Sequence, residues 1–152
     1  MELSQSARYA LYAAMELARA GEAPVTVGEV AGTHHIPEAA LAKVFQQLVR
    51  ADLAVGIRGV GGGYLLARPA ADITVLDLIS VFDRTRPKGR CLLTRRGEGP
   101  CVHDLDCRLR HLVEEVDEGA RSTYASVTLE TLVRPAALAV PAPAPVAVRR
   151  RG

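Results

Sequence analysis

The spacing of apolar residues in the first quarter of the chain predicts a helix. Between residues 4 and 21, Leu and Ala recur three and four positions apart, as on the buried face of a helix. Ser4 is placed to accept a hydrogen bond as the N-cap, and Gly21 is placed to end the helix.

Residues 26–51 carry the pattern of two short helices joined by a tight turn. Thr26 and Glu29 have capping-box spacing, which predicts a short helix that runs out near Gly32. After the turn, Pro37 suits the first position of a second helix. The apolar face of that second helix is predicted to contain Leu41, Val44, Phe45, Leu48 and Val49. Two such helices indicate a helix-turn-helix motif.

The period then changes from helical to extended. Residues 53–57 and 64–67 read as two strands, and the glycine-rich residues 58–63 read as the loop between them. A hairpin that directly follows a helix-turn-helix is a wing. Residues 1–82 are therefore predicted to form a winged helix-turn-helix domain. Its last element is a helix capped by Thr74 with Asp77, running through Phe82.

The second half of the chain contains a loop, a long helix and a tail. Residues 83–104 are rich in Arg, Gly and Pro, which predicts an irregular loop. Residues 105–134 are predicted to form a long dimerisation helix, and residues 135–152 a disordered Pro/Ala tail. The predicted seam is Leu105, Leu109, Leu112, Val116, Ala120, Tyr124 and Val127. An ordinary core helix remains the alternative, because Gly119 and Ala120 also permit close packing within one chain.

Composition narrows the class of protein. The chain is 49% hydrophobic but only 4% aromatic, and 24 of its 152 residues are alanine, so we expect a thin core. No apolar run approaches the roughly 20 residues needed to span a bilayer, and the start lacks a signal-peptide pattern. We therefore expect a cytoplasmic protein without membrane contact. It is not expected to be an enzyme, because no Ser/His/Asp set or P-loop is present.

The predicted winged helix-turn-helix is a candidate site for double-stranded DNA. Net charge is only +2, but 17 of the 19 basic residues are Arg, which suits phosphate and guanine recognition and also reflects genome base composition. The second helix would enter the major groove, and the wing would bring its arginine to the minor groove. The candidate DNA contacts are His35, Pro37, Glu38, Ala39, Lys43, Gln47, Arg50, Arg58, Gly59 and Gly61. A protein-interaction module of the same fold is the alternative.

Three cysteines, Cys91, Cys101 and Cys107, form a second candidate site. Their number is odd, which excludes a complete disulfide framework within one chain. Thiolates select zinc, copper(I) and iron–sulfur clusters, and gaps of nine and five residues are too long for a zinc knuckle. The spacing favours a cluster with a fourth, different ligand. The candidates are His103, Asp104, Asp106 and His111, or a residue from a partner subunit. A cluster-free thiol switch and a zinc site remain alternatives.

These residues together resemble the IscR/NsrR type of winged-helix regulators, the Rrf2 family. The resemblance spans about residues 1–134 and rests on MELSQSARYAL, on the cysteine loop and above all on RGVGGGYLLARP followed by ITVLDLI. It implies a homodimer that binds palindromic operators and carries a 2Fe–2S or 4Fe–4S cluster. It also implies that Cys91, Cys101 and Cys107 are the cluster ligands, that Arg58 enters the minor groove, and that nitric oxide, redox state or iron supply is the signal.

The chain departs from the family pattern at the fourth ligand. In nitric-oxide sensors of the family, an acid on the first helix of the partner subunit supplies it, and that position is Arg8 here. In cluster-assembly regulators a histidine three residues after the last cysteine supplies it, and that position is Arg110, with His111 one residue late. We thus expect a mainly helical homodimeric repressor whose fourth cluster ligand is left open.

Overall fold

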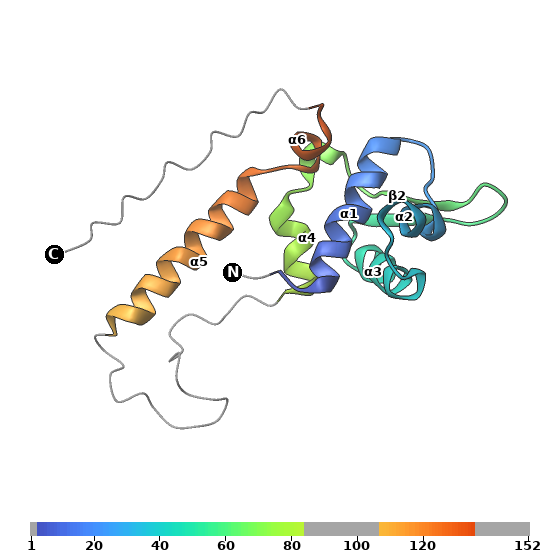
Figure 1. Ribbon diagram of the computed structural model, residues 1–152. Coiled ribbons are helices and arrows are strands. Elements are labelled where there is room, and N and C mark those ends of the chain that lie inside the picture. The colour runs from blue at the N-terminus through green and yellow to red at the C-terminus, as the bar shows by residue number, and fades with distance from the viewer. Residues whose placement is uncertain (1–2, 84–106, 136–152) are drawn as a thin grey trace.

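The computed structural model describes residues 3–83 and 107–135. Cys91, Cys101 and the predicted tail lie outside the described residues. The helices are α1 (Gln5–Ala20), α2 (Val27–His34), α3 (Glu38–Arg50), α4 (Val75–Phe82), α5 (Arg108–Ser126) and α6 (Leu129–Val133), with a short 3-10 turn at Ala70–Asp72. Two antiparallel strands, β1 (Ala54–Ile57) and β2 (Gly63–Leu66), form the hairpin. The predicted fold class, a mainly helical winged helix-turn-helix, is confirmed (Figure 1).

Residues 3–83, which contain α1 to α4 and the hairpin, are called the head below. Local capping determines where the helices of the head begin. The Ser4 side chain accepts a hydrogen bond from the backbone N–H of Ala7 at 3.1 Å, so α1 starts where the sequence predicted. α2 and α4 both begin with complete capping boxes, Thr26 with Glu29 and Thr74 with Asp77. These boxes satisfy orphan N–H groups at each helix start without help from the rest of the fold.

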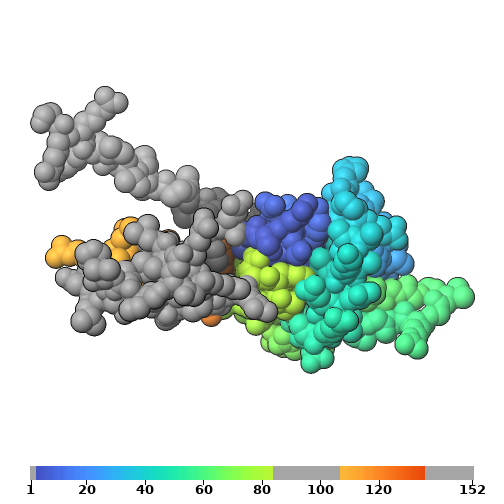
Figure 2. Space-filling model, turned by 90° about the horizontal axis from the view of Figure 1, so that it is seen from below, coloured from blue at the N-terminus to red at the C-terminus, as the bar shows by residue number. Residues whose placement is uncertain are grey.

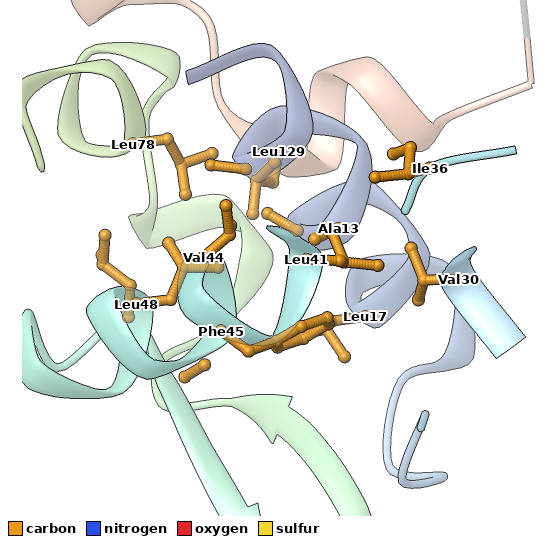
Figure 3. Close-up of a cluster of buried hydrophobic side chains, with 14 of the residues drawn as sticks. Ala13, Leu17, Val30, Ile36, Leu41, Val44, Phe45, Leu48, Leu78 and Leu129 are labelled. Carbon is orange, nitrogen blue, oxygen red and sulfur yellow. The ribbon is translucent and has the colours of Figure 1, made fainter. Parts of the chain in front are cut away.

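The core lies between α1, α3 and α4, and α1 runs through its centre (Figures 1 and 3). The buried face of α1 consists of Ala7, Ala10, Ala13, Ala14 and Leu17. Alanine side chains are short, so the neighbouring helices approach α1 closely, which is how this alanine-rich chain closes a core. Most of the larger buried side chains come from α3, α4 and α6, among them Leu41, Phe45, Leu48, Leu78 and Leu129.

The helix-turn-helix differs from its prediction in small ways. α2 continues to His34, two residues past the expected end, and His35 ends it in the left-handed conformation. Pro37 is the N-cap of α3, not its first residue, because its ψ of 123° is not helical although its carbonyl already accepts from the N–H of Leu41. Val49 is 37% exposed, not part of the core face, because it lies at the outer border of the buried stripe of α3.

The predicted long helix 105–134 is two helices. α5 begins at Arg108 and ends at Ser126, and α6 follows after Val127 and Thr128. The break is caused by a β-bridge: the backbone N–H of Val75 donates to the Val127 carbonyl, and the N–H of Leu129 donates to the Ile73 carbonyl, both at 2.9 Å. Both residues at the break are extended, so the helix cannot continue through them.

Candidate DNA-binding face and cysteine segment

The exposed side of α3 carries most of the residues predicted to contact DNA. Its opposite side is buried through Leu41, Val44, Phe45 and Leu48. The exposed residues at its start and along its length are Pro37, Glu38, Ala39, Lys43, Gln46, Gln47 and Arg50. Figure 2 shows α3 and the hairpin on one face of the molecule, with the hairpin projecting beyond the body. The fold thus brings the two predicted DNA-contacting elements together.

The turn between α2 and α3 is held against α1. His35 is exposed and adopts φ +53°, as a left-handed C-cap. His34 instead faces inward: its Nε2 lies 3.0 Å from Oε1 of Glu16, and its ring centroid is 4.9 Å from that of Tyr12. The structure gives it an anchoring contact between the motif and α1.

The base of the wing is pinned by a residue that precedes α2. Val25 forms a β-bridge with Tyr64: the N–H of Val25 donates to the Tyr64 carbonyl at 3.0 Å, and the N–H of Tyr64 donates back at 2.8 Å. The Tyr64 ring also stacks on Phe45 of α3, with centroids 4.5 Å apart. The wing is therefore oriented by contacts with both the segment before α2 and α3.

Glycines shape the tip of the wing. Gly59 and Gly61 have φ of +106° and +76°, a region that residues with a side chain rarely adopt. The N–H of Gly62 donates to the carbonyl of Gly59 at 3.0 Å and closes a β-turn. Arg58 is exposed beside this turn. Tight backbone closure and exposed arginine together form a narrow, positively charged projection.

Residues 91–107, which contain the three cysteines, are called the cysteine segment here. Only its last residue lies among the described residues. Cys107 is a free, half-buried thiol and the N-cap residue of α5. His111 follows one helical turn later, with its N–H donating to the Cys107 carbonyl at 3.1 Å, and its side chain is exposed. Within residues 3–83 and 107–135 no three His, Cys, Asp or Glu side chains gather into a metal site. Cys91 and Cys101 lie outside that part of the chain.

The two positions where the family places a fourth ligand hold arginines in distinct settings. Arg8 is exposed on α1. The Nε atom of Arg110 lies 4.0 Å from Oε1 of Glu114, one turn along α5. A guanidinium carries no lone pair available to iron, so neither residue can act as ligand.

An apolar stripe runs along α5, which extends away from the head (Figure 1). Leu109, Leu112 and Val116 are 59%, 56% and 58% exposed. The exposed line continues through Gly119 and Thr123, at alternating spacings of three and four residues. Ala120 and Tyr124, which the sequence placed on the seam, are instead half-buried. The stripe of Leu109, Leu112, Val116, Gly119 and Thr123 is called the α5 stripe below.

Across the described part of the chain, no helix is both long and apolar enough to cross a membrane.

Comparison with known proteins identifies related sequences and structures. The family model Rrf2, an iron-dependent transcriptional regulator, matches residues 3–135. The HTH-type transcriptional regulator BadM of Rhodopseudomonas palustris is 34% identical over 134 residues, which cover 88% of this chain and 82% of BadM. The transcriptional regulator IscR of Escherichia coli O1:K1 is 31% identical over 134 residues, covering 88% of this chain and 80% of IscR.

Solved structures agree with this relationship. CymR, the global cysteine regulator of B. subtilis, superposes with a TM-score of 0.71 at 28% identity, covering 88% of this chain and 96% of CymR. IscR of T. potens superposes with a TM-score of 0.70 at 25% identity, covering 88% of this chain and 86% of that chain. These relatives are regulators and not enzymes. The chain accordingly belongs to the Rrf2 family of winged-helix transcriptional regulators.

Proposed function

We propose that this regulator is a cytoplasmic homodimeric repressor that binds a palindromic operator and ligates an iron–sulfur cluster through Cys91, Cys101 and Cys107. The observation that carries DNA binding is the exposure of α3 and the wing on one face (Figure 2). A recognition helix in the major groove with a wing over the neighbouring minor groove is the arrangement that this geometry supports. Lys43, Arg50 and Arg58 supply positive charge on that face.

The α5 stripe supports pairing with a second copy of the chain. Spacing of three and four residues is that of a coiled-coil seam, and in a single chain its three large side chains are more than half exposed. Gly119 adds to this argument, because a Cβ placed there would meet nothing within 4 Å in the single chain. Glycine in a helix interior costs about 1 kcal/mol relative to alanine, so a close approach by another chain gives it a role. Two-fold pairing would present two recognition helices to a palindrome.

The residues of the cysteine segment fit an iron–sulfur cluster by their chemistry. Three thiols are the ligand type that such clusters use, and the family model is described as iron-dependent. Cys107 is the N-cap residue of α5, and its side chain makes no capping hydrogen bond there. His111 lies on the same side of the helix one turn later and is the candidate fourth ligand among the described residues. When bound, a cluster would supply a group that reacts with nitric oxide or oxidants, or that is gained and lost with iron supply.

A connection between the two sites supports regulation. α5 begins next to Cys107 and ends at the β-bridge that ties Val127 and Leu129 to the start of α4. α4 packs on α1, as does α3. A change at the cysteine end would therefore reach the DNA-binding head through packed helices and would reset the spacing of two recognition helices. This coupling requires that the two states differ in their DNA contacts.

Anaerobic purification tests the cofactor. We expect coloured protein with iron and sulfide in equal amounts, lost in Cys107→Ser and reduced in His111→Ala. His35→Ala is the matched control, because it removes an exposed imidazole far along the chain from the cysteines and should retain the iron. Zinc without iron would replace the proposal with a zinc-dependent regulator. Colourless, metal-free protein with full DNA binding would replace it with a thiol switch.

Footprinting on genomic fragments at stated salt concentrations tests DNA binding. We expect protection of a palindrome, and we expect Lys43→Ala to weaken binding and to lower the salt slope by about 1 if Lys43 contacts a phosphate. Ala125→Ser, which changes an exposed residue of α5, is the control and should leave both values unchanged. If no palindrome is protected at low salt, the fold serves as a protein-interaction module instead.

A further inference from the structure

The tip of the wing presents only two side chains. Residues 58–63 read Arg-Gly-Val-Gly-Gly-Gly, so four glycines surround Arg58 and Val60. Val60 is fully exposed, at 112% of its reference area, and is the most exposed large apolar residue of the described chain. An isolated exposed valine is unremarkable on most surfaces. Here it stands at the tip of a projection whose only other side chain is that of Arg58.

The backbone holds Val60 at a fixed place. Val60 is the second residue of the β-turn closed by the hydrogen bond from Gly62 to Gly59, with Gly61 at the position that requires positive φ. A Cβ on Gly62 would lie 2.9 Å from the Gly59 carbonyl oxygen, so this turn is closed too tightly for a side chain there. The valine is thus presented outward from a closed turn and not from a loose loop.

Only a slim projection fits the minor groove, which is about 6 Å wide. Its floor has one large chemical difference: a G·C pair carries the protruding 2-amino group of guanine, whereas an A·T pair presents the C2–H of adenine at that place. An apolar side chain packs against C2–H without loss, but it covers the amino group and leaves that donor without a partner. Arg58 is attracted to narrow A·T-rich tracts through its charge. That attraction does not depend on direct contact with the 2-amino group of guanine.

We propose that Val60 is a specificity-determining residue that selects A·T over G·C pairs under the wing by contact with the minor-groove floor. The inference rests on the proposed DNA binding and adds to it a source of sequence preference separate from α3. It predicts that each half-site has a position where preference comes from the minor groove alone.

Base analogues isolate this contact, because 2,6-diaminopurine adds a 2-amino group to adenine in the minor groove and leaves the major-groove edge unchanged. Replacing adenine by 2,6-diaminopurine at the pairs protected by the wing should weaken wild-type binding about tenfold, which is about 1.4 kcal/mol. Replacing guanine by inosine at the same pairs of a G·C-substituted operator removes the amino group and should restore binding. The variant Val60→Thr, which keeps the shape and adds a hydroxyl, should reduce the diaminopurine effect to less than about threefold.

Val55→Thr is the matched control, because Val55 lies on β1 of the same hairpin, away from the tip, and should leave the diaminopurine effect at the wild-type value. Thermal unfolding of both variants checks that the hairpin is intact. Equal diaminopurine sensitivity in wild type and Val60→Thr would overturn the inference, since groove width or Arg58 would then carry the preference. Wild-type binding that ignores the analogue would overturn it as well, whereas absence of any binding would instead refute the proposed function.

Discussion

At the scale of single residues, the wing depends on positions where any side chain would collide with backbone. A Cβ built on Gly63 would lie 2.7 Å from the carbonyl oxygen of Val25, the residue that pairs with the wing base. Other glycines face no such limit: a Cβ on Gly32 of α2 would meet nothing within 4 Å. The surroundings of Gly63 therefore require a glycine, whereas those of Gly32 do not.

Gly63→Ala should destabilise the protein by about 1–3 kcal/mol, because Val25 must move away from the added methyl group. Gly32→Ala should stabilise it by up to about 1 kcal/mol, because alanine loses less backbone entropy in a helix. Urea unfolding of the two variants beside wild type measures both. Equal effects of the two substitutions would show that the wing base is not constrained by this contact.

The sequence predicted the structural role of a residue only where that role depends on neighbours close in the chain. Arg58 and the tip glycines were predicted because a glycine-rich loop between two short strands indicates a hairpin. The pairing of Val25 with Tyr64 and the contact of His34 with Glu16 were missed, because each joins residues far apart in the chain. A lone valine before a capping box carries no signal of strand pairing.

At the scale of elements, the same rule separates what was predicted from what was not. α1, α2 and α4 start at their predicted caps, since the capping side chain and the N–H it accepts from are three residues apart. The end of α5 was missed because it is imposed by a β-bridge to Ile73 and Val75, more than fifty residues away. Leu109, Leu112 and Val116 of the predicted seam are exposed in the single chain, whereas Ala120 and Tyr124 are half-buried, and Leu105 lies outside the described residues.

Leu129 anchors α6 in the core, where it is 0% exposed, whereas Leu132 of the same helix is 37% exposed. Leu129→Ala should cost about 2–5 kcal/mol through lost burial and the cavity that remains. Leu132→Ala, the same chemical change in the same helix, should cost less, about 1–2 kcal/mol, because more than a third of its surface stays in water and no enclosed cavity is left. Thermal unfolding distinguishes the two, and a similar loss in both would mean that α6 is not held through Leu129.

The capping box of α2 makes part of the stability dependent on pH. The backbone N–H of Thr26 and then its side chain donate to Glu29 and hold its pKa below the ordinary value of 4.5. A lowered carboxyl pKa contributes stability that is fully present above the unfolded value and is lost as the pH falls through the folded value. The urea midpoint of wild type should therefore fall more steeply below pH 4.5 than that of Glu29→Gln. Parallel curves for the two proteins would contradict this role.

At the scale of the whole molecule, the head is complete in one chain and α5 is not. Every large residue with less than 2% exposure lies in the head or in α6, and α5 has no buried residue within its described length. The alanine-rich core expected from composition is thus closed within one chain, by the packing of α3, α4 and α6 on α1. The exposed α5 stripe is the surface on which we propose that a second copy packs.

Leu112→Glu should convert the dimer to a monomer, because it places a charge in the middle of the α5 stripe. Ser122→Glu introduces the same side chain at an exposed position of α5 outside the stripe and should leave the dimer intact. Analytical ultracentrifugation measures the mass, and operator affinity should fall with loss of the dimer. A dimer that survives Leu112→Glu would place the subunit contact elsewhere.

The bridge that ends α5 also determines how motion would be shared between the two ends of that helix. With 19 residues, α5 is about 28 Å long, and the β-bridge joins its C-terminal end to the start of α4, on which α5 also packs. A displacement of about 2 Å at Cys107, on such an arm, corresponds to a rotation of about 4° at the bridge. α5 is geometrically a lever with its pivot beside α4, so the cysteine end and the DNA-binding head exchange rotation more readily than translation. In the proposed regulation, small angular changes at the bridge would therefore move the head while its own core stays packed.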